Sequence, residues 1–337
     1  MGGGYSSPRV QPERLDPLVT LSYYLEGHFR IVGGKEWLPQ KSSQTDEKTP
    51  SGRLKGQKLM GNTGRVQGKV AFITGAARGQ GRSHAQLLAS EGADIVALDI
   101  ADQIDSVSYP MSTREDLDET VRLVKEAGGR CLPLVADVRD IRAMERAVKE
   151  TLAEFGRLDI VLANAGILHI SRGDESLDES AVRWTDALGV MLTGVYNTIR
   201  VVQQPMIDQG QGGCIVITSS TAGLSGMHDG SGGIAAYCAS KHGVVGLMRG
   251  YAKLLGTHNI RVNTIHPMGV ATPMVINEQF QKYHADHSDV LEISPRLLPI
   301  TLLEPKDVSN AILWLVSDEA RAVTGIALPV DSGVTCP

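Results

Sequence analysis

The feature that most constrains the fold of this chain is a short apolar run followed at once by closely spaced glycines. Val70–Thr74 has the length and apolar content of a buried strand, and Gly75, Gly79 and Gly81 come directly after it. A helical pattern from Ser83 to Glu91 follows the glycines. A strand that passes through a glycine-rich turn into a helix forms an anion site, because the backbone can approach a pyrophosphate and the helix N-terminus presents unpaired N–H groups. The sequence therefore predicts that a nucleotide phosphate binds at this turn.

The glycine spacing is Gly-x-x-x-Gly-x-Gly, which differs from the commonest dinucleotide fingerprint and on its own also fits a plain turn. Two further features favour the nucleotide. A second strand pattern, Ala93–Leu98, ends at Asp99, where a carboxylate can accept hydrogen bonds from both hydroxyls of a ribose. Much later, Tyr237 and Lys241 are four residues apart, which places both on one face of a helix. The three features in this order predict a dinucleotide-binding protein with a Tyr–Lys pair.

The composition of the chain excludes several classes of function. The net charge is −5 and no lysine or arginine cluster occurs, so we expect no nucleic-acid partner. The 4 cysteines form no Cys-x-x-Cys pair and no metal-binding spacing with histidine, which predicts thiols in a reducing cytoplasm and no metal site. No apolar run reaches the length of a membrane span, so no membrane partner is expected.

Apolar strand patterns and amphipathic helical patterns alternate from Val70 onward. Near-continuous apolar strands separated by helices indicate a parallel sheet covered on both faces, here an α/β fold of the Rossmann type with a doubly wound sheet. The alternation does not break, so residues 66–337 are predicted to form a single domain. The expected strands are Val70–Thr74, Ala93–Asp99, Cys131–Val135, Ile160–Ala163, Cys214–Thr218, Val262–His266 and Ile326–Val330. The expected buried helix stripes are Leu117, Val121, Val124 and Ile141, Met144, Val148, Leu152.

Residues 1–65 differ from the rest of the chain. From Gln40 to Gly64 the sequence is rich in Lys, Ser, Thr, Gly and Gln, a composition that cannot bury enough surface to fold. Leu15–Leu25 is partly apolar but lacks the layout of a signal peptide. We expect a poorly ordered N-terminal extension, or one outside the native product because Met60 is the true start.

From about Gly68 to Thr335 the chain resembles the short-chain dehydrogenase/reductase family, and within it the mycofactocin-associated group that includes carveol-dehydrogenase-like proteins. The likeness is carried by TGAARGQG (74–81), Asp137-Val138, Asn164-Ala165-Gly166, Thr218-Ser219-Ser220, YCASK (237–241) and HPMGVATPM (266–274). The subgroup likeness rests on GQGRSHA (79–85) and on the extra stretch between Ile100 and Glu115. The resemblance implies a homotetrameric NAD-dependent oxidoreductase, with a hydrophobic secondary alcohol or its ketone as substrate and mycofactocin as a redox carrier.

By resemblance, the cofactor is held by strand ends and turns. A carboxylate at Asp99 repels a 2′-phosphate and so favours NAD over NADP, whereas a basic residue such as Arg78 often accompanies NADP in the family. An NADPH-dependent ketoreductase is therefore the alternative. The predicted cofactor-binding residues are Gly75, Arg78, Gly79, Gln80, Gly81, Asp99, Asp137, Val138, Asn164, Ala165, Gly166, Tyr237, Lys241, Pro267, Val270 and Thr272.

The expected chemistry is hydride transfer, which needs a group that exchanges a proton with the substrate oxygen. A free tyrosine has a pKa of about 10, and a nearby lysine ammonium together with the positive nicotinamide favours the phenolate and lowers that pKa. Tyr237 is therefore predicted to be the catalytic acid/base and Lys241 its catalytic partner, which also bonds the nicotinamide ribose. Ser220 is the third predicted catalytic residue and holds the substrate oxygen, with Ser219 as the weaker candidate.

One residue departs from the family pattern. Where the family places an asparagine that links the lysine to bulk water, the run GVMLTGVYN (189–197) has Met191. A thioether makes no useful hydrogen bond there, so only the backbone carbonyl of Met191 could hold the relay water. A weakly active NAD-binding protein is therefore a second alternative.

The substrate is less well defined by the sequence. Pro273–Pro299 is expected to form a lid, and Met274, Val275 and Ile276 near its start fit either a hydrophobic alcohol or simple packing. His228 lies in a glycine-rich loop and is interpreted as a solvated histidine rather than a catalytic one. None of these residues selects one alcohol.

The crossover Ile100–Arg114 is longer than the few residues that such a connection needs. Its apolar side chains, Ile104, Val107 and Tyr109, would be unnecessary in a free loop. We expect this insertion to fold over the adenosine half of NAD and to keep the cofactor bound, the alternative being a solvated surface insertion. The resemblance of this insertion to the mycofactocin-associated group implies a nicotinamide that is retained and reoxidised in place by a separate electron carrier.

Overall fold

The computed structural model describes residues 64–170, 175–227, 229–286 and 296–336. Within these ranges the chain forms a parallel sheet of 7 strands in the order β3-β2-β1-β4-β5-β6-β7. The strands are β1 (Val70–Thr74), β2 (Asp94–Asp99), β3 (Cys131–Val135), β4 (Ile160–Ala163), β5 (Gly213–Thr218), β6 (Ile260–Pro267) and β7 (Ala327–Val330). The order reverses between β1 and β4, which is the topological switch point of a doubly wound sheet. The predicted fold and the seven predicted strands are confirmed.

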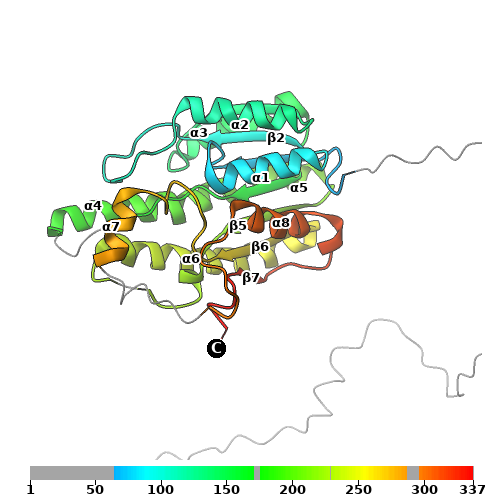
Figure 1. Cartoon of the computed structure of the whole chain (residues 1–337). Coiled ribbons are helices and arrows are strands. Elements are labelled where there is room, and N and C mark those ends of the chain that lie inside the picture. The colour runs from blue at the N-terminus through cyan, green and yellow to red at the C-terminus, as the bar shows by residue number, and fades with distance from the viewer. Residues whose placement is uncertain (1–63, 171–174, 228, 287–295, 337) are drawn as a thin grey trace, which may run out of the picture. The chain divides into compact units, whose positions relative to one another are not determined.

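Helices cover both faces of the sheet (Figure 1). The elements between the strands are α1 (Gly79–Ser90), α2 (Arg114–Glu126), α3 (Ile141–Phe155), α4 (Leu177–Leu188), η2 (Gly189–Thr193), α5 (Gly194–Gln209), η3 (Thr221–Gly223), α6 (Gly232–Leu255), η4 (Gly256–His258), α7 (Glu278–Asp286), α8 (Pro305–Val316) and η5 (Asp318–Ala320). Neighbouring residues of a strand face opposite sides. Phe72 therefore packs in the core with α3, α5 and α6, whereas Ile73 packs in the core with α1, α2 and α8.

The predicted helix stripes are buried at Leu117, Val124, Met144 and Val148, whereas Ile141 is exposed. Helix α1 begins at Gly79 rather than at the predicted Ser83. Two glycines of the turn, Gly79 and Gly81, already belong to the helix despite the low helix propensity of glycine. None of the described helices is long and apolar enough to cross a membrane. The predictions about residues 1–63 and His228 fall outside the described residues.

Candidate active site

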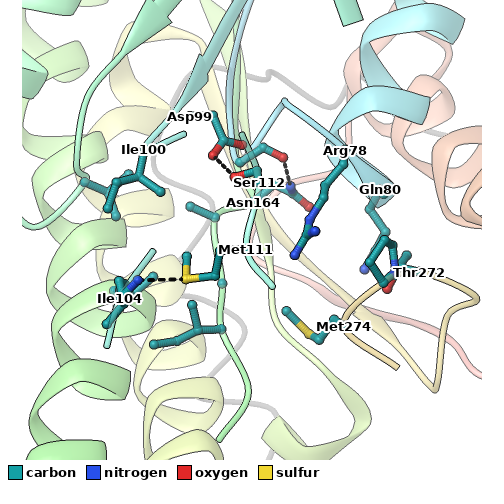
Figure 2. A pocket seen from close by; sticks show the side chains of 18 of the residues that line it. Arg78, Gln80, Asp99, Ile100, Ile104, Met111, Ser112, Asn164, Thr272 and Met274 are labelled. Atoms are coloured by element: carbon teal, nitrogen blue, oxygen red, sulfur yellow. Dashed lines mark hydrogen bonds between the residues drawn. The ribbon is translucent and has the colours of Figure 1, made fainter. Parts of the chain in front are cut away.

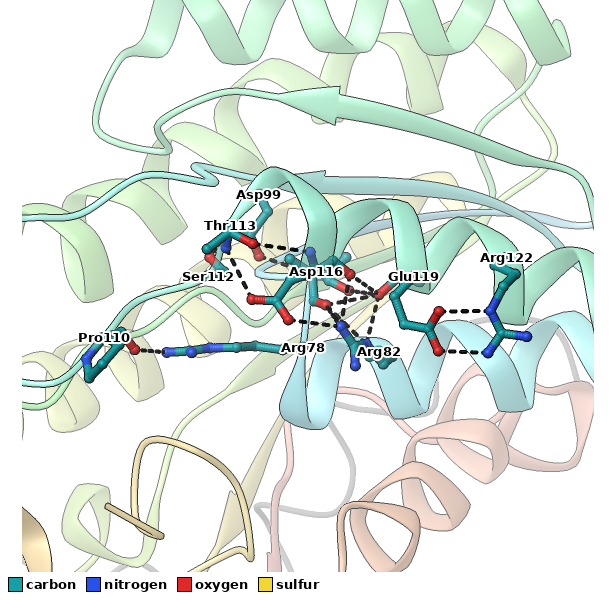
Figure 3. A network of polar contacts seen from close by, with 12 residues as sticks. Arg78, Arg82, Asp99, Pro110, Ser112, Thr113, Asp116, Glu119 and Arg122 are labelled. Atoms are coloured by element: carbon teal, nitrogen blue, oxygen red, sulfur yellow. Dashed lines mark hydrogen bonds and ion pairs between the residues drawn. The ribbon is translucent and has the colours of Figure 1, made fainter. Parts of the chain in front are cut away.

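The glycine turn after β1 is tightly packed from two sides. Gly75 has a φ of +68°, and a Cβ there would lie 2.8 Å from the Cα of Ala165. A Cβ at Gly81 would lie 2.1 Å from the carbonyl oxygen of Gly75, so only glycine fits at both positions. The carbonyl of Ala77 within the turn accepts hydrogen bonds from Arg82 Nε at 3.0 Å and from the hydroxyl of Thr120 at 2.9 Å. The turn is therefore held in one conformation by α1 and α2, as Figure 3 shows for Arg82.

A cleft of about 880 Å³, which includes open solvent, lies beyond the carboxyl ends of β1, β2 and β4 (Figure 2). Its position at the switch point is where doubly wound folds bind ligands. The predicted cofactor-binding residues that line it are Gly75, Arg78, Gly79, Gln80, Asp99, Asp137, Val138, Asn164, Ala165, Gly166 and Thr272.

Asp99 ends β2 at the floor of this cleft and is only 6% exposed. Its Oδ2 accepts from the N–H of Ala77 at 2.9 Å, while Oδ1 accepts from the hydroxyl of Ser112 at 2.6 Å and the N–H of Ala101 at 3.2 Å. A carboxylate offers about four acceptor positions. Three are already used, so the remaining one is on Oδ2. The prediction that Asp99 accepts from both ribose hydroxyls stays a prediction, and the geometry favours a single direct bond.

Arg78 and Asp137 are both engaged by protein groups at the cleft wall. The guanidinium of Arg78 donates to the carbonyl of Pro110 at 2.7 Å, as Figure 3 shows. Asp137 accepts from Arg139 Nε at 2.8 Å, and Arg139 also donates to Asp186 at 2.8 Å. Arg78 is therefore oriented by the insertion that follows β2 rather than by the glycine turn alone.

The three predicted catalytic residues come together at the end of β5 and the start of α6, although none of them lines the cleft directly. Ser220 precedes η3, and its hydroxyl oxygen accepts from the N–H of Ala222 at 3.2 Å. The side chain of Ser220 interacts with the hydroxyl of Tyr237 and lowers its pKa. Lys241 Nζ lies 5.5 Å from the centroid of the Tyr237 ring. The fold thus brings together the three residues that the sequence pattern predicted to be catalytic.

Burial shifts the pKa values of both Tyr237 and Lys241. Burial raises the pKa of Tyr237, and the hydrogen bond with Ser220 opposes that rise. The ammonium of Lys241 donates to the carbonyl of Thr218 at 2.8 Å, and burial lowers its pKa to about 8. Burial therefore dominates the pKa of Tyr237 in this structure, and the ammonium of Lys241 is bonded to a backbone carbonyl. The prediction that Lys241 and a bound nicotinamide together lower this pKa stays a prediction.

The structure also separates the two candidate serines. Ser219 is 3% exposed, and its hydroxyl donates to the carbonyl of Lys241 at 2.8 Å. A Cβ at Gly223 would lie 2.4 Å from this hydroxyl, so a glycine leaves the space for the contact. Ser219 therefore ties β5 to α6, while Ser220 is the serine that reaches Tyr237.

Met191 lies within η2, a π-helical turn between α4 and α5. Its side chain is 1% exposed and lies close to Gly166, at whose position a Cβ would be 3.8 Å from Met191 Cγ. Single π-helical turns inside α-helices occur frequently at functional sites. This turn could not be predicted from the sequence, since its residues continue an ordinary helical pattern.

The segment after β6 contributes less to the cleft than predicted. Thr272 lines it, and a Cβ at Gly79 would lie 3.2 Å from Thr272 Cγ2. Pro267 is the last residue of β6, and Val270 is 4% exposed and bridges to Leu303. Neither Pro267 nor Val270 lines the cleft. Of the predicted lid, helix α7 is described, whereas residues 287–295 lie outside the described ranges.

The insertion between β2 and α2 is packed against the domain. Ile104, Val107 and Tyr109 are 6%, 4% and 3% exposed and belong to the core that contains α3, α5 and α6. The hydroxyl of Tyr109 accepts from the N–H of Leu168 at 3.2 Å, and burial raises its pKa to about 12. The alternative of a solvated surface insertion is therefore wrong.

Polar contacts hold the same insertion at several further points. The hydroxyl of Ser106 donates to Asp186 at 2.5 Å and lies 2.9 Å from His169 Nε2. Gln103 Nε2 donates to the carbonyl of Val107 at 2.9 Å, and Ser112 donates to Asp99. The sequence could not indicate the contacts of Ser106, because His169 and Asp186 are 63 and 80 residues away in the chain.

Known proteins share this architecture along most of the chain. A family model described as enoyl-(acyl carrier protein) reductase matches residues 75–335. An uncharacterized oxidoreductase of Mycobacterium tuberculosis is 51% identical over 269 residues, which are 80% of this chain and 96% of that protein. The chain belongs to the short-chain dehydrogenase/reductase family. The family and the enzyme class predicted from the sequence, an oxidoreductase, are thereby confirmed.

Two members of the short-chain dehydrogenase/reductase family that resemble the chain are named carveol dehydrogenases. The (-)-trans-carveol dehydrogenase of Rhodococcus erythropolis is 42% identical over 279 residues, covering 80% of this chain and 99% of the relative. The crystal structure of carveol dehydrogenase from Mycobacterium avium in complex with NAD is 44% identical, with a TM-score of 0.74. That match covers 82% of this chain and 100% of the solved one.

Proposed function

We propose that this chain is an NAD-dependent dehydrogenase that interconverts a hydrophobic secondary alcohol and its ketone. The observation that carries the proposal is the hydrogen-bonded pair Ser220–Tyr237, with Lys241 buried beside it. Tyr109 lines the cleft, and its phenol also interacts electrostatically with Tyr237. The likeness to carveol dehydrogenases supports the substrate class.

The residues of the cleft fit a dinucleotide. The glycine turn leads into the start of α1, where a pyrophosphate can meet unpaired N–H groups, and Asp99 has an acceptor position left for a ribose hydroxyl. Bound NAD would supply the hydride acceptor for alcohol oxidation. NAD is favoured over NADP because Asp99 repels a 2′-phosphate and the guanidinium of Arg78 is already directed to Pro110.

Ser220 and Tyr237 have different roles toward the substrate oxygen. The hydroxyl of Ser220 holds this oxygen, and Tyr237 takes its proton in alcohol oxidation or returns it in ketone reduction. The ammonium of Lys241 donates to the carbonyl of Thr218, and Lys241 lies about one turn of α6 after Tyr237. Burial keeps Tyr237 protonated at neutral pH, which suits proton donation to a ketone and makes alcohol oxidation faster in alkali.

We also propose that the insertion retains the cofactor. Tyr109, Ser106 and Ser112 each make a hydrogen bond to a different part of the domain, and these bonds must break before the insertion can open. A retained cofactor needs reoxidation in place by a separate carrier, for which mycofactocin is the candidate. The exchange of bound NAD against labelled NAD tests this proposal, and exchange within seconds would contradict it.

We further propose a homotetramer. Helix α4 presents apolar side chains to solvent, with Leu177 90%, Val182 54% and Trp184 41% exposed, and such patches mark interaction surfaces. Light scattering measures the mass in solution. A monomer at micromolar concentration would contradict the proposal.

The central test of the function combines cofactor identification with turnover. The nucleotide that co-purifies is identified, and hydrophobic secondary alcohols are screened with an artificial electron acceptor. Tyr237→Phe should bind NAD like the wild type and lose about 10²–10⁴-fold in turnover, since it lacks only the acid/base. A Phe variant within a few-fold of wild type would instead support the weakly active NAD-binding alternative.

A further inference from the structure

His266 lies behind the active-site serine and is 0% exposed. It belongs to β6, which pairs with β5 up to Thr218 and Ile265. The last backbone bond of this ladder runs from the N–H of Ser219 to the carbonyl of Ile265 at 2.8 Å. Ser220 is therefore the first residue beyond the ladder, where the sheet no longer fixes the backbone.

Two groups hold the carbonyl of Ser220 in place of the ladder. His266 Nδ1 lies 2.8 Å from it, and the N–H of Gly223 donates to it at 2.9 Å. A carbonyl only accepts hydrogen bonds and has two lone pairs, so both are used and Nδ1 must be the donor. The Gly223 bond is made within the short turn η3 itself, which leaves His266 as the contact from the sheet.

The rest of the imidazole is also bonded. His266 Nε2 lies 2.8 Å from the hydroxyl of Thr264, which donates to Nε2 in the neutral imidazole. Burial lowers the pKa of His266, so this neutral form persists at physiological pH. The other titratable groups that act on the ring are Lys241, His242 and Asp331. The two bonds fix one tautomer and one ring orientation.

We propose that His266 is a positioning residue that acts through Ser220. By holding the Ser220 carbonyl, it fixes the direction in which the Ser220 hydroxyl meets Tyr237 and the substrate oxygen. The inference rests on the proposed function of Ser220 and Tyr237. It differs from a purely structural role, in which His266 fills the sheet and affects stability alone.

A matched pair of substitutions separates the two roles. In His266→Asn an amide N–H₂ can occupy the place of Nδ1 and still donate to Ser220. In His266→Gln the amide lies one carbon further out, at the place of Nε2, and reaches Thr264 instead. Thr264→Val is the control, because it removes the partner of Nε2 and leaves the Nδ1 contact in place.

The variants are compared in melting temperature, NAD binding, kcat, KM and the pH profile of kcat. His266→Gln should lower kcat by about 10- to 100-fold with little change in KM, since a displacement of about 1 Å at a reacting group can cost 10²-fold. The Ser220 bond lowers the pKa of Tyr237, so the pH limb of alcohol oxidation should move upward in this variant. His266→Asn and Thr264→Val should stay within a few-fold of wild type, with an unmoved limb.

Equal losses in the Asn and Gln variants that follow melting temperature would overturn the proposal, as would a Gln variant with wild-type kcat and pH profile. A Thr264→Val loss as large as that of Gln would also overturn it. If neither His266 variant folds, ¹⁵N-histidine NMR of the wild type decides, since a tautomer protonated at Nε2 contradicts the Ser220 bond. Tyr237→Phe is measured alongside. Retained turnover in that variant would contradict the proposed function itself, whereas an inactive Phe variant with a fully active His266→Gln refutes only the positioning role.

Discussion

His84 gives the protein a stability that depends on pH. It lies on α1, is 1% exposed, and its Nδ1 is 2.7 Å from the hydroxyl of Ser309 on α8. Its Nε2 is buried and has no hydrogen-bond partner. Burial lowers the pKa of His84 from 6.5 to about 3. The folded protein therefore keeps this imidazole neutral under conditions in which the unfolded chain protonates it.

The sign and size of the effect follow from proton linkage. Below pH 6.5 the unfolded state binds a proton that the folded state does not, so acid lowers the free energy of unfolding until the pH reaches the folded pKa of about 3. Each pKa unit corresponds to about 1.4 kcal/mol. The effect begins below pH 6.5, and pH 5 lies about 1.5 units below that value. Going from pH 7.5 to pH 5, His84 should therefore lower the free energy of unfolding by about 2 kcal/mol.

Urea unfolding of wild type and His84→Asn at both pH values measures this contribution. The Asn amide can still bond Ser309, and any packing loss cancels because it is present at both pH values. The stability advantage of wild type over the variant should shrink by about 2 kcal/mol from pH 7.5 to pH 5. His258→Asn is the control, since it removes a histidine that is exposed in η4 instead of one that is buried. An advantage that is the same at both pH values within about 0.5 kcal/mol would refute the reasoning.

Further predictions concern the cofactor and the chemistry. Asp99→Asn should weaken NAD binding and admit NADP, and a variant whose NAD:NADP preference by fluorescence titration equals that of wild type would argue against Asp99 as the selector. Met191→Asn should raise kcat at neutral pH if the asparagine side chain restores a water link to Lys241, whereas an unchanged kcat would show that the backbone carbonyl suffices. Ser106→Ala removes the bonds to Asp186 and His169 and should speed the exchange of bound NAD, measured with labelled NAD; an unchanged rate would place the barrier elsewhere. The kcat of alcohol oxidation should keep rising above neutral pH, because burial raises the pKa of Tyr237; a plateau reached below pH 7 would contradict that shift.

The sequence was sufficient for the sheet and for most of the cleft. Strands such as Val70–Thr74 are continuous apolar runs, and a run of this kind is stable only when both of its faces are covered. Local pattern therefore specifies the parallel α/β architecture. The glycines of the turn and the carboxylate at the end of β2 could be found in the same way, because they lie at the ends of two of these strand patterns.

Only the tertiary structure decided the roles that depend on distant contacts. It separated Ser219 from Ser220, since one bonds the carbonyl of Lys241 and the other bonds Tyr237. It showed that burial raises the pKa of Tyr237, because burial is a property of the packed fold and not of spacing along α6. It brought His266 to Ser220 across 46 residues of sequence. Such contacts form only after the sheet has aligned its strands, so no local pattern in the chain encodes them.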